Sequence, residues 1–150
     1  MVGDFDSSDK PEGVDTIVYP VEKNDTDSEI AIKLGIEKGF SEIVLTCTLG
    51  GRCDHLISNL FMITNFDNVS IDESDCIIEY VNEYKELTGF TGKTVSLVPV
   101  CESYITLSGF KYPLDDVVCF GTTLTMSNIV VEDIAKIKIK YGKVLLIITK

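Results

Sequence analysis

The sequence has little of several residue types that functional sites commonly use. Its 150 residues include no tryptophan, one histidine and one arginine. A single histidine excludes a metal centre ligated by several histidines. The five cysteines are odd in number and form no Cys-x-x-Cys pair, so the sequence indicates neither a disulfide framework nor a zinc site. A reducing compartment, the cytoplasm, is therefore the expected location.

Basic charge and long apolar runs are also scarce. Lysine and arginine number 13 against 24 aspartates and glutamates, which gives a formal net charge of −11. Nucleic acids and anionic membranes require clustered basic residues, so neither is an expected partner. No apolar run approaches the roughly 18 residues of a transmembrane helix, and no signal peptide follows Met1. The hydrophobic content of 45% still suffices for a packed core.

The first half of the chain alternates between two kinds of pattern. Between residues 14 and 80, short β-branched runs alternate with helical patterns. Such alternation is typical of crossover units and predicts an α/β domain with a mainly parallel sheet. Thr26 is the expected N-cap of the first helix, and Glu29 follows three residues later as in a capping box. The expected strands are 16–19 and 43–46, and the expected helices are 27–38 and 54–65.

The second half has a different pattern. From about residue 84, short strand-like runs are separated by turn residues, which predicts an all-β sandwich or barrel. Strands are expected at 95–100 and 104–107. Two stretches with apolar residues at alternate positions, 137–141 and 144–148, flank Gly142 and predict a hairpin. The boundary between the halves is placed near residues 83–90, which gives domains 1–85 and 86–150.

Pairs of carboxylates occur twice among the first thirty residues, which hold nine acidic groups and two lysines. Asp4 and Asp6, followed by Ser7, could hold one Mg²⁺ together with waters and substrate phosphates. The alternative is that these residues form Asx turns. Asp25 and Asp27 repeat the spacing where a helix is expected to begin, and the N–H groups there favour bound phosphate. Ordinary helix capping is the simpler explanation of the second pair taken alone.

The most specific motif is Gly-Gly-Arg-Cys-Asp-His at residues 50–55, followed by Asn59. It lies between an expected strand and an expected helix, so its glycines would let the backbone approach an anion. Arg52 offers a fork of donors that suits phosphate, and Asp54 or His55 can share a helix face with Asn59. The alternative is that the glycines cap the strand and the histidine is structural. We favour a functional site because polar residues gather where a strand meets a helix.

Taken together and in this order, the motifs resemble those of the thiamine pyrophosphokinase family. The family's Gly-Asp-Phe-Asp-Ser motif corresponds to residues 3–7, and its Lys-Asp-x-Thr-Asp segment corresponds to 23–27. Its Gly-Gly-Arg-x-Asp-His-x-x-x-Asn motif corresponds to 50–59. The second half is similar at 96–99, 109–114, 127–128 and 142–146. The likeness covers nearly the whole chain.

The resemblance implies an activity and roles for individual residues. The implied reaction is transfer of pyrophosphate from ATP to thiamine with Mg²⁺, giving thiamine diphosphate and AMP. The implied architecture is an α/β catalytic domain, a β-rich thiamine-binding domain and a homodimer with active sites at the interface. Asp4, Asp6 and Asp27 are expected to bind Mg²⁺, with Asp27 also orienting or deprotonating the thiamine hydroxyl. Arg52 is expected to stabilise phosphate charge, and Asp54 to orient the substrate or Arg52. Further residues expected to contact ATP or thiamine are Ser7, Thr26, His55, Asn59, Ser127 and Asn128.

Two features depart from the family pattern. Asn24 stands where many members have aspartate, which removes one possible carboxylate. The family also has a portion before Gly-Asp-Phe-Asp-Ser, including an Asp-Gly-Gly segment on the nucleotide side. Two residues cannot replace a crossover unit, so the chain is expected to be an N-terminally truncated member. Two alternatives stay open: a non-catalytic thiamine-binding remnant, and another Mg²⁺-dependent nucleotide transferase that uses the Asp-x-Asp pair.

Overall fold

The computed structural model describes residues 2–3, 12–13, 17–18 and 25–150. The chain divides into two compact units, residues 1–43 and 44–150, and each is described by itself. In the first unit, β1 (Val2–Gly3) and β2 (Ile17–Val18) form a parallel pair, and α1 spans Asp27–Glu37. The strand β3 (Ile43–Leu45) follows and includes the boundary between the two units. The predicted first helix and second strand are thus confirmed to within one residue at each end.

Helix α1 begins and ends as its sequence predicts. The Thr26 hydroxyl accepts a hydrogen bond of 3.3 Å from the backbone N–H of Glu29, which satisfies one of the unpaired donors of the first turn. Ile30 and Ile32 are buried. Gly39 follows the last turn with φ at 82°, a conformation that costs glycine least. The N-cap and the C-terminal glycine therefore fix the length of the helix.

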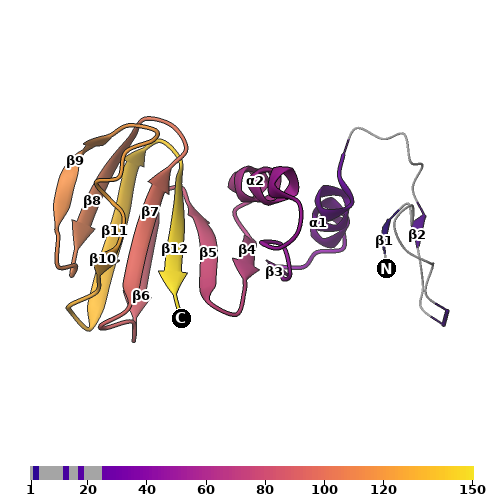
Figure 1. Cartoon of the computed structure of the whole chain (residues 1–150), viewed down its shortest axis with the longest axis horizontal. Coiled ribbons are helices and arrows are strands. Elements are labelled where there is room, and N and C mark those ends of the chain that lie inside the picture. Colours follow the sequence, from indigo (N-terminus) through magenta and orange to yellow (C-terminus); the bar gives the residue numbers. More distant parts are fainter. Residues whose placement is uncertain (1, 4–11, 14–16, 19–24) are drawn as a thin grey trace. The chain divides into compact units, whose positions relative to one another are not determined.

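The second unit is rich in strands and contains two sheets (Figure 1). The larger sheet has the order β10-β7-β12-β5-β4-β3, and the smaller has the order β6-β11-β8-β9. Helix α2 (Cys53–Met62) leads into a 3₁₀ turn, η1 (Ile63–Asn65), which contacts β5. The remaining strands are β4 (Val69–Asp72), β5 (Cys76–Val81), β6 (Tyr84–Thr88), β7 (Thr94–Pro99), β8 (Ser103–Ser108), β9 (Leu114–Val118), β10 (Asn128–Ile129), β11 (Ile134–Tyr141) and β12 (Val144–Thr149).

Antiparallel pairing dominates these sheets. Neighbouring strands from β10 to β4 pair antiparallel, and so do all neighbours in the four-stranded sheet. The expected β-rich second half is confirmed. The mainly parallel sheet expected for the first half is found only in part: β1 and β2 pair parallel, but β4 and β5 pair antiparallel across a connection of only three residues, 73–75. A connection of that length permits a hairpin and excludes a crossover. The domain boundary at residues 85 and 86 stays a prediction.

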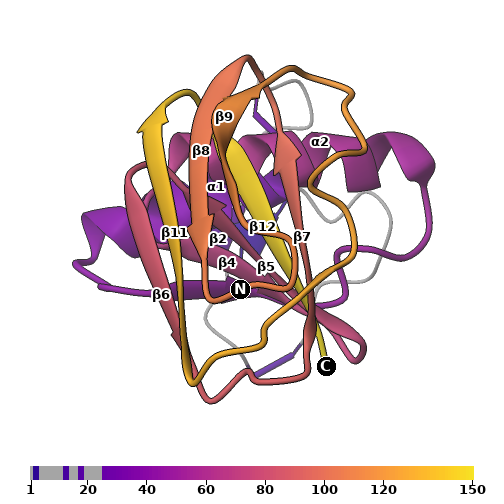
Figure 2. The ribbon, with the colours of Figure 1, turned by 90° about the vertical axis from the view of Figure 1, so that its left-hand side faces the viewer.

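The hydrophobic core of the second unit lies between its two sheets. Figure 2 looks onto the four-stranded sheet, with strands of the six-stranded sheet behind it. On β11, Ala135, Ile137 and Ile139 are buried, whereas the lysines that alternate with them are exposed. The core cluster consists of Val81, Leu87, Val95, Leu97, Ile105, Leu107, Phe110, Val118, Val130, Ala135, Ile137, Ile139, Val144, Leu146 and Ile148.

The hairpin expected around Gly142 is wrong. Strand β11 pairs with β6 and β8 in the four-stranded sheet, whereas β12 pairs with β5 and β7 in the six-stranded sheet. Gly142, with φ at 99°, connects one sheet to the other. Strand β11 has one lysine-bearing face and suits a sheet with one face in water, but β12 is apolar at five consecutive positions, 144–148. Such a run requires cover on both faces, so the two strands fit different sheets.

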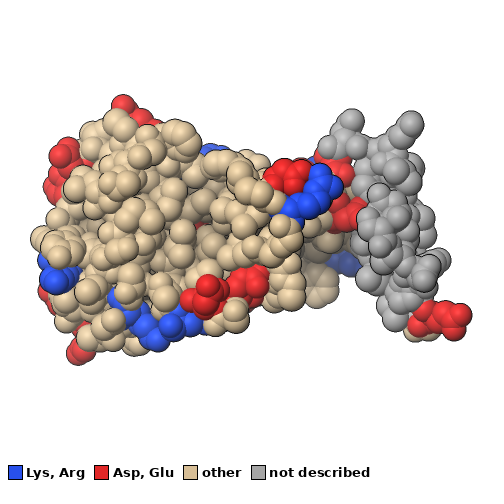
Figure 3. Space-filling view, in the orientation of Figure 1, with Lys and Arg blue, Asp and Glu red and all other residues tan. Residues whose placement is uncertain are grey.

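Basic side chains on the surface mostly have acidic neighbours. On the face seen in Figure 3, basic side chains lie beside acidic ones at several places, whereas the acidic side chains at the upper left have no basic neighbour in this view. Ion pairs in the second unit include Lys85 with Glu79 and Lys150 with Asp72. None of the helices in the described ranges is long and apolar enough to cross a membrane.

Gly142 approaches β8 too closely to carry a side chain. A Cβ at this position would lie 2.1 Å from Ser103 Oγ and 2.6 Å from Ser103 Cα. We predict that Gly142→Ala lowers the free energy of unfolding by about 3 kcal/mol or more, through positive-φ strain and overpacking together. Gly121 has φ at 81° but no atom within 4 Å of such a Cβ. Gly121→Ala should therefore cost only about 1–2 kcal/mol. Urea denaturation measures both values, and equal costs would contradict this account.

Candidate functional site

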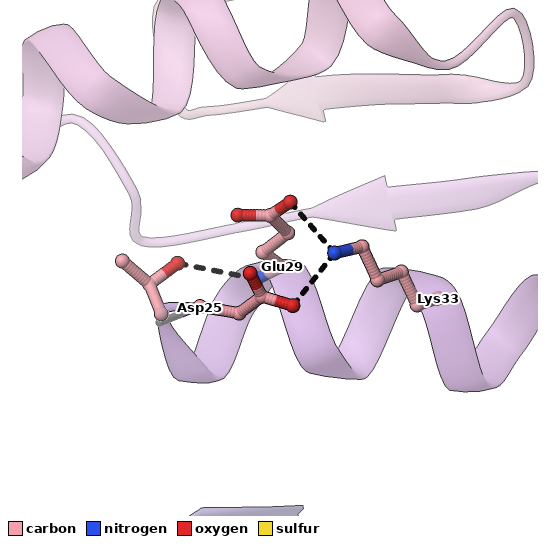
Figure 4. A network of polar contacts seen from close by, with 4 residues as sticks. Asp25, Glu29 and Lys33 are labelled. Atoms are coloured by element: carbon pink, nitrogen blue, oxygen red, sulfur yellow. Dashed lines mark hydrogen bonds and ion pairs between the residues drawn. The ribbon is translucent and has the colours of Figure 1, made fainter. Parts of the chain in front are cut away.

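The first group of candidate residues lies at the N-terminus of α1 (Figure 4). Lys33 Nζ lies 2.6 Å from Asp25 Oδ2 and 2.9 Å from Glu29 Oε1. These hydrogen bonds, the one to Asp25 first, raise the pKa of Lys33. The carboxylate of Asp25 is thus engaged by an ammonium group. Asp27, the predicted metal ligand in this segment, lies in the first turn of the helix, where the helix dipole favours negative charge.

The predicted metal site is described only in part. Asp4, Asp6 and Ser7 lie outside the described residues. Within the ranges that the structure describes, no group of three or more His, Cys, Asp or Glu side chains is arranged to hold a metal ion. Of the three predicted Mg²⁺ ligands, Asp27 alone is therefore placed by the structure.

The glycine-arginine motif forms the predicted junction between a strand and a helix. Strand β3 ends at Leu45 and α2 begins at Cys53, with Arg52 in an extended conformation at the N-cap position. Arg52 and Asp54 make a two-pronged contact, with Nε 3.1 Å from Oδ1 and Nη2 2.6 Å from Oδ2. Asp54 Oδ1 also accepts a 3.0 Å hydrogen bond from the backbone N–H of His55. The structure thus brings Arg52 and Asp54 together.

The Arg52–Asp54 ion pair orients the guanidinium but contributes little to the stability of the fold. The side chains of Arg52 and Asp54 are 74% and 63% exposed, and ion pairs so exposed contribute little to folding. Their mutual hydrogen bonds raise the pKa of Arg52 and lower the pKa of Asp54. Both groups therefore stay charged near neutral pH, and the guanidinium is held in one direction at the N-terminus of α2. Helix N-termini are favourable places for phosphate.

The other two residues of this motif have different surroundings. His55 is exposed, whereas Asn59 is buried. Asn59 Nδ2 lies 3.5 Å from the carbonyl oxygen of Thr48, a weak donor contact to the loop that precedes the glycines. The helix therefore presents His55 to solvent and directs Asn59 toward the loop.

Glu73 is a residue of this region that the sequence did not suggest. It lies in the turn between β4 and β5, and its Oε1 accepts hydrogen bonds from Thr48 N at 2.6 Å and Leu49 N at 3.3 Å. The same oxygen accepts a hydrogen bond from the Thr48 hydroxyl at 3.2 Å. Cys47, at the start of this loop, has φ at 58°. One carboxylate oxygen thus holds the backbone directly before Gly50.

A partial signal for this contact is present in the sequence. Thr48 and Glu73 each follow the C-terminal end of a strand, β3 and β4, and these strands are neighbours in the six-stranded sheet. Residues after strand ends commonly build ligand sites in α/β proteins. However, the sequence patterns predict no strand at 69–72, so they do not place Glu73 beside Thr48.

Ser127 and Asn128 lie where the chain enters β10. Ser127 has φ at 55°, and its backbone N–H donates to Ser96 Oγ at 2.9 Å. Asn128 is buried and bonds the backbone of Tyr112 twice, accepting from its N–H at 3.0 Å and donating to its carbonyl at 2.7 Å. The Tyr112 side chain is exposed, with Lys111 Nζ 5.3 Å from its ring centroid. Asn128 therefore fixes the backbone that carries this exposed ring.

Comparison with known proteins relates both halves of the chain to the same family. Residues 1–72 match the model described as thiamin pyrophosphokinase, catalytic domain, and residues 76–146 match its vitamin B1 binding domain. The thiamine pyrophosphokinase of Bacillus subtilis (strain 168) is 32% identical over an alignment of 120 residues, which covers 74% of this chain. The chain spans 56% of the length of that relative.

Solved structures show the same fold. The crystal structure of thiamin pyrophosphokinase from Geobacillus thermodenitrificans superposes with a TM-score of 0.84 at 28% identity, covering 99% of this chain and 76% of that one. The structure of the Bacillus subtilis protein has a TM-score of 0.86 at 24% identity, with 99% and 77% covered. These likenesses define a class of proteins that combine a catalytic domain with a vitamin-binding domain. The chain belongs to the thiamin pyrophosphokinase family.

The hydrogen bonds to Glu73 have a consequence for pH dependence. They lower the pKa of Glu73, the Thr48 N–H contributing most. Because the folded pKa lies below the unfolded value of about 4.3, the carboxylate stabilises the loop fully above that pH and progressively less below it. We predict that the amide resonances of Thr48 and Leu49 shift as pH falls below about 4, with Glu73 titrating below the ordinary glutamate value. NMR titration measures both, and a Glu73 pKa at or above the ordinary value would contradict the prediction.

Proposed function

We propose that this chain transfers the pyrophosphoryl group of ATP to thiamine, giving thiamine diphosphate and AMP. The observation that carries the proposal is the Arg52 guanidinium, fixed by Asp54 at a helix N-terminus in a chain that matches both thiamin pyrophosphokinase domains. A planar cation at that position suits a polyphosphate. The acidic net charge of −11 is compatible with a cationic second substrate such as thiamine.

The reaction requires positioning more than covalent chemistry. The hydroxyl oxygen of thiamine forms a bond to the β-phosphorus of ATP, and the bond from that phosphorus to the oxygen shared with the α-phosphorus breaks. The hydroxyl proton passes to a base, and AMP leaves with the bonding electron pair. Such transfers depend on alignment and on stabilisation of charge, so no side-chain nucleophile is needed.

We assign the predicted aspartates to Mg²⁺ binding and to proton transfer from the thiamine hydroxyl. Asp27, with Asp4 and Asp6, would hold Mg²⁺, because carboxylate oxygens are ligands that this ion prefers. When bound, the ion would neutralise charge on the ATP phosphates. Asp27 would also orient the thiamine hydroxyl or accept its proton.

We assign the remaining residues to the two substrates. Arg52 would stabilise charge on the phosphates, with Asp54 holding it in place. Ser7, Thr26, His55 and Asn59 complete the proposed nucleotide side. Ser127 and Asn128 are proposed on the thiamine side, Asn128 acting through the Tyr112 backbone that it bonds.

Assembly and location are part of the proposal. The family resemblance supports a homodimer in which Ser127 and Asn128 serve the partner subunit's active site. All five cysteines are free thiols, which supports the reducing cytoplasm as the location.

Product formation tests the reaction. Incubation with Mg²⁺-ATP and thiamine should give thiamine diphosphate and AMP in equal amounts, measured by chromatography. Asp6→Ala should abolish this Mg²⁺-dependent AMP release while the circular dichroism spectrum is unchanged, and Asp9→Ala, which alters an acid outside the motif, should not. Full activity of Asp6→Ala would refute the metal role. Thiamine binding without nucleotide binding would favour a binding module, and hydrolysis of a nucleotide sugar would favour a different transferase.

The planar guanidinium of Arg52 should contribute to catalysis through its geometry as well as through its charge. Arg52→Lys keeps the positive charge but loses the two-pronged contact with Asp54, so we predict a fall in kcat of about 10²-fold, comparable to the loss of one donor to a developing charge. The thermal unfolding midpoint should hardly change, because the pair is exposed. Lys85→Arg, an exchange between the same two residue types in another ion pair, serves as the control. Equal kcat for Arg52→Lys and the unaltered chain would exclude a role for the fork.

A further inference from the structure

The loop before the glycine-arginine motif has few contacts of its own that could fix it. Residues 46–52 separate β3 from α2, and Gly50 and Gly51 carry no side chains to pack. A side chain added to either glycine would meet no atom within 4 Å, so the backbone there has open space around it. Asp54 and α2 fix Arg52 from the downstream side, so the backbone that needs an anchor of its own is the glycine segment and the residues before it.

Glu73 supplies such an anchor. Its Oε1 accepts hydrogen bonds from two consecutive backbone N–H groups, of Thr48 and Leu49, and from the Thr48 hydroxyl. Hydrogen bonds to an ionised acceptor are about twice as strong as those between neutral groups. Asn59 lies 3.5 Å from the carbonyl oxygen of Thr48. The loop is therefore tied through Thr48 both to the turn between β4 and β5 and to α2.

The turn that carries Glu73 is itself fixed. Lys150 Nζ donates to the carbonyl oxygen of Glu73 at 2.5 Å and also pairs with the carboxylate of Asp72. The backbone N–H of Lys150 donates to the carbonyl oxygen of Asp75 at 2.9 Å. The backbone N–H of Glu73 donates to the carbonyl oxygen of Cys76 at 2.9 Å. Glu73 is thus presented to the loop from a turn held on several sides, which is what an anchor requires.

We propose that Glu73 is a positioning residue, which holds residues 47–49 so that the glycine backbone beside Arg52 meets the phosphates of the nucleotide. This inference rests on the proposed function. In this proposal Glu73 has no contact with substrate. Its role differs from that of the neighbouring Asp72, whose carboxylate binds Lys150. Small misplacements of a group that acts on a reacting phosphate are costly, so loosening this loop should weaken nucleotide binding.

Three variants separate positioning from a general structural role. Glu73→Ala removes the acceptor, and Glu73→Gln keeps an oxygen acceptor without the charge. Glu83→Ala makes the same change at an exposed glutamate between β5 and β6 and serves as the matched control. The affinity of each for a non-hydrolysable ATP analogue with Mg²⁺, and for thiamine, is measured by calorimetry. Thermal unfolding of each variant is followed in parallel.

We expect a selective loss on the nucleotide side. Glu73→Ala should bind the analogue about tenfold more weakly or worse, with thiamine affinity unchanged within about twofold. Glu73→Gln should stay within about threefold of the unaltered chain, since it retains an oxygen acceptor. Glu83→Ala should bind as the unaltered chain does. If Glu73→Ala does not fold, Glu73→Asp replaces it, because its carboxylate is one methylene short of the loop, and the same loss is expected.

Two results would overturn the inference. One is undiminished analogue binding by Glu73→Ala or Glu73→Asp, and the other is an equal loss of analogue and thiamine affinity. The product assay keeps this test separate from the proposed function. An unaltered chain that binds the analogue with the expected variant pattern but forms no thiamine diphosphate would refute the function and support the positioning role. An unaltered chain that does not bind the analogue would overturn both.

Discussion

The packing of two sheets across one apolar core determines where the loops of the second unit emerge. Strand β12 is central to this arrangement, because it pairs with β5 on one side and β7 on the other. Its five consecutive apolar residues, 144–148, place part of the strand in the shared core and leave Leu145 buried on the opposite face. Close packing of this kind tolerates little change in register, so the strand ends are fixed relative to one another.

The candidate site of the second unit depends on those strand ends. Loop 46–52 follows β3, and the turn 73–75 follows β4, which is the neighbour of β3 in the six-stranded sheet. This adjacency lets Glu73 bond the backbone of residues 48 and 49. A rigid scaffold therefore carries a glycine-containing loop, and one carboxylate joins the two. The Arg52–Asp54 pair lies where this loop enters α2.

Prediction from the sequence succeeded where the deciding interactions are local. Thr26 caps α1 by bonding the backbone of a residue three positions away. Alternation of lysine and isoleucine correctly indicated β11 as a strand with one buried face. Prediction failed where partners are distant. The hairpin at Gly142 was wrong because strands adjacent in sequence pair with others across the fold. The pairing in the first half is mixed rather than mainly parallel because the antiparallel pair of β4 and β5 was not anticipated.

The sequence by itself determined the family, the order of the motifs and the start of each helix, since these depend on residue types at short fixed spacings. Only the tertiary structure decided that β11 and β12 belong to different sheets, that Asn128 bonds Tyr112, and that Glu73 bonds Thr48. The last two contacts join residues 16 and 25 positions apart. No periodicity links such positions, because their proximity follows from burial of apolar faces between sheets rather than from any local preference of the chain.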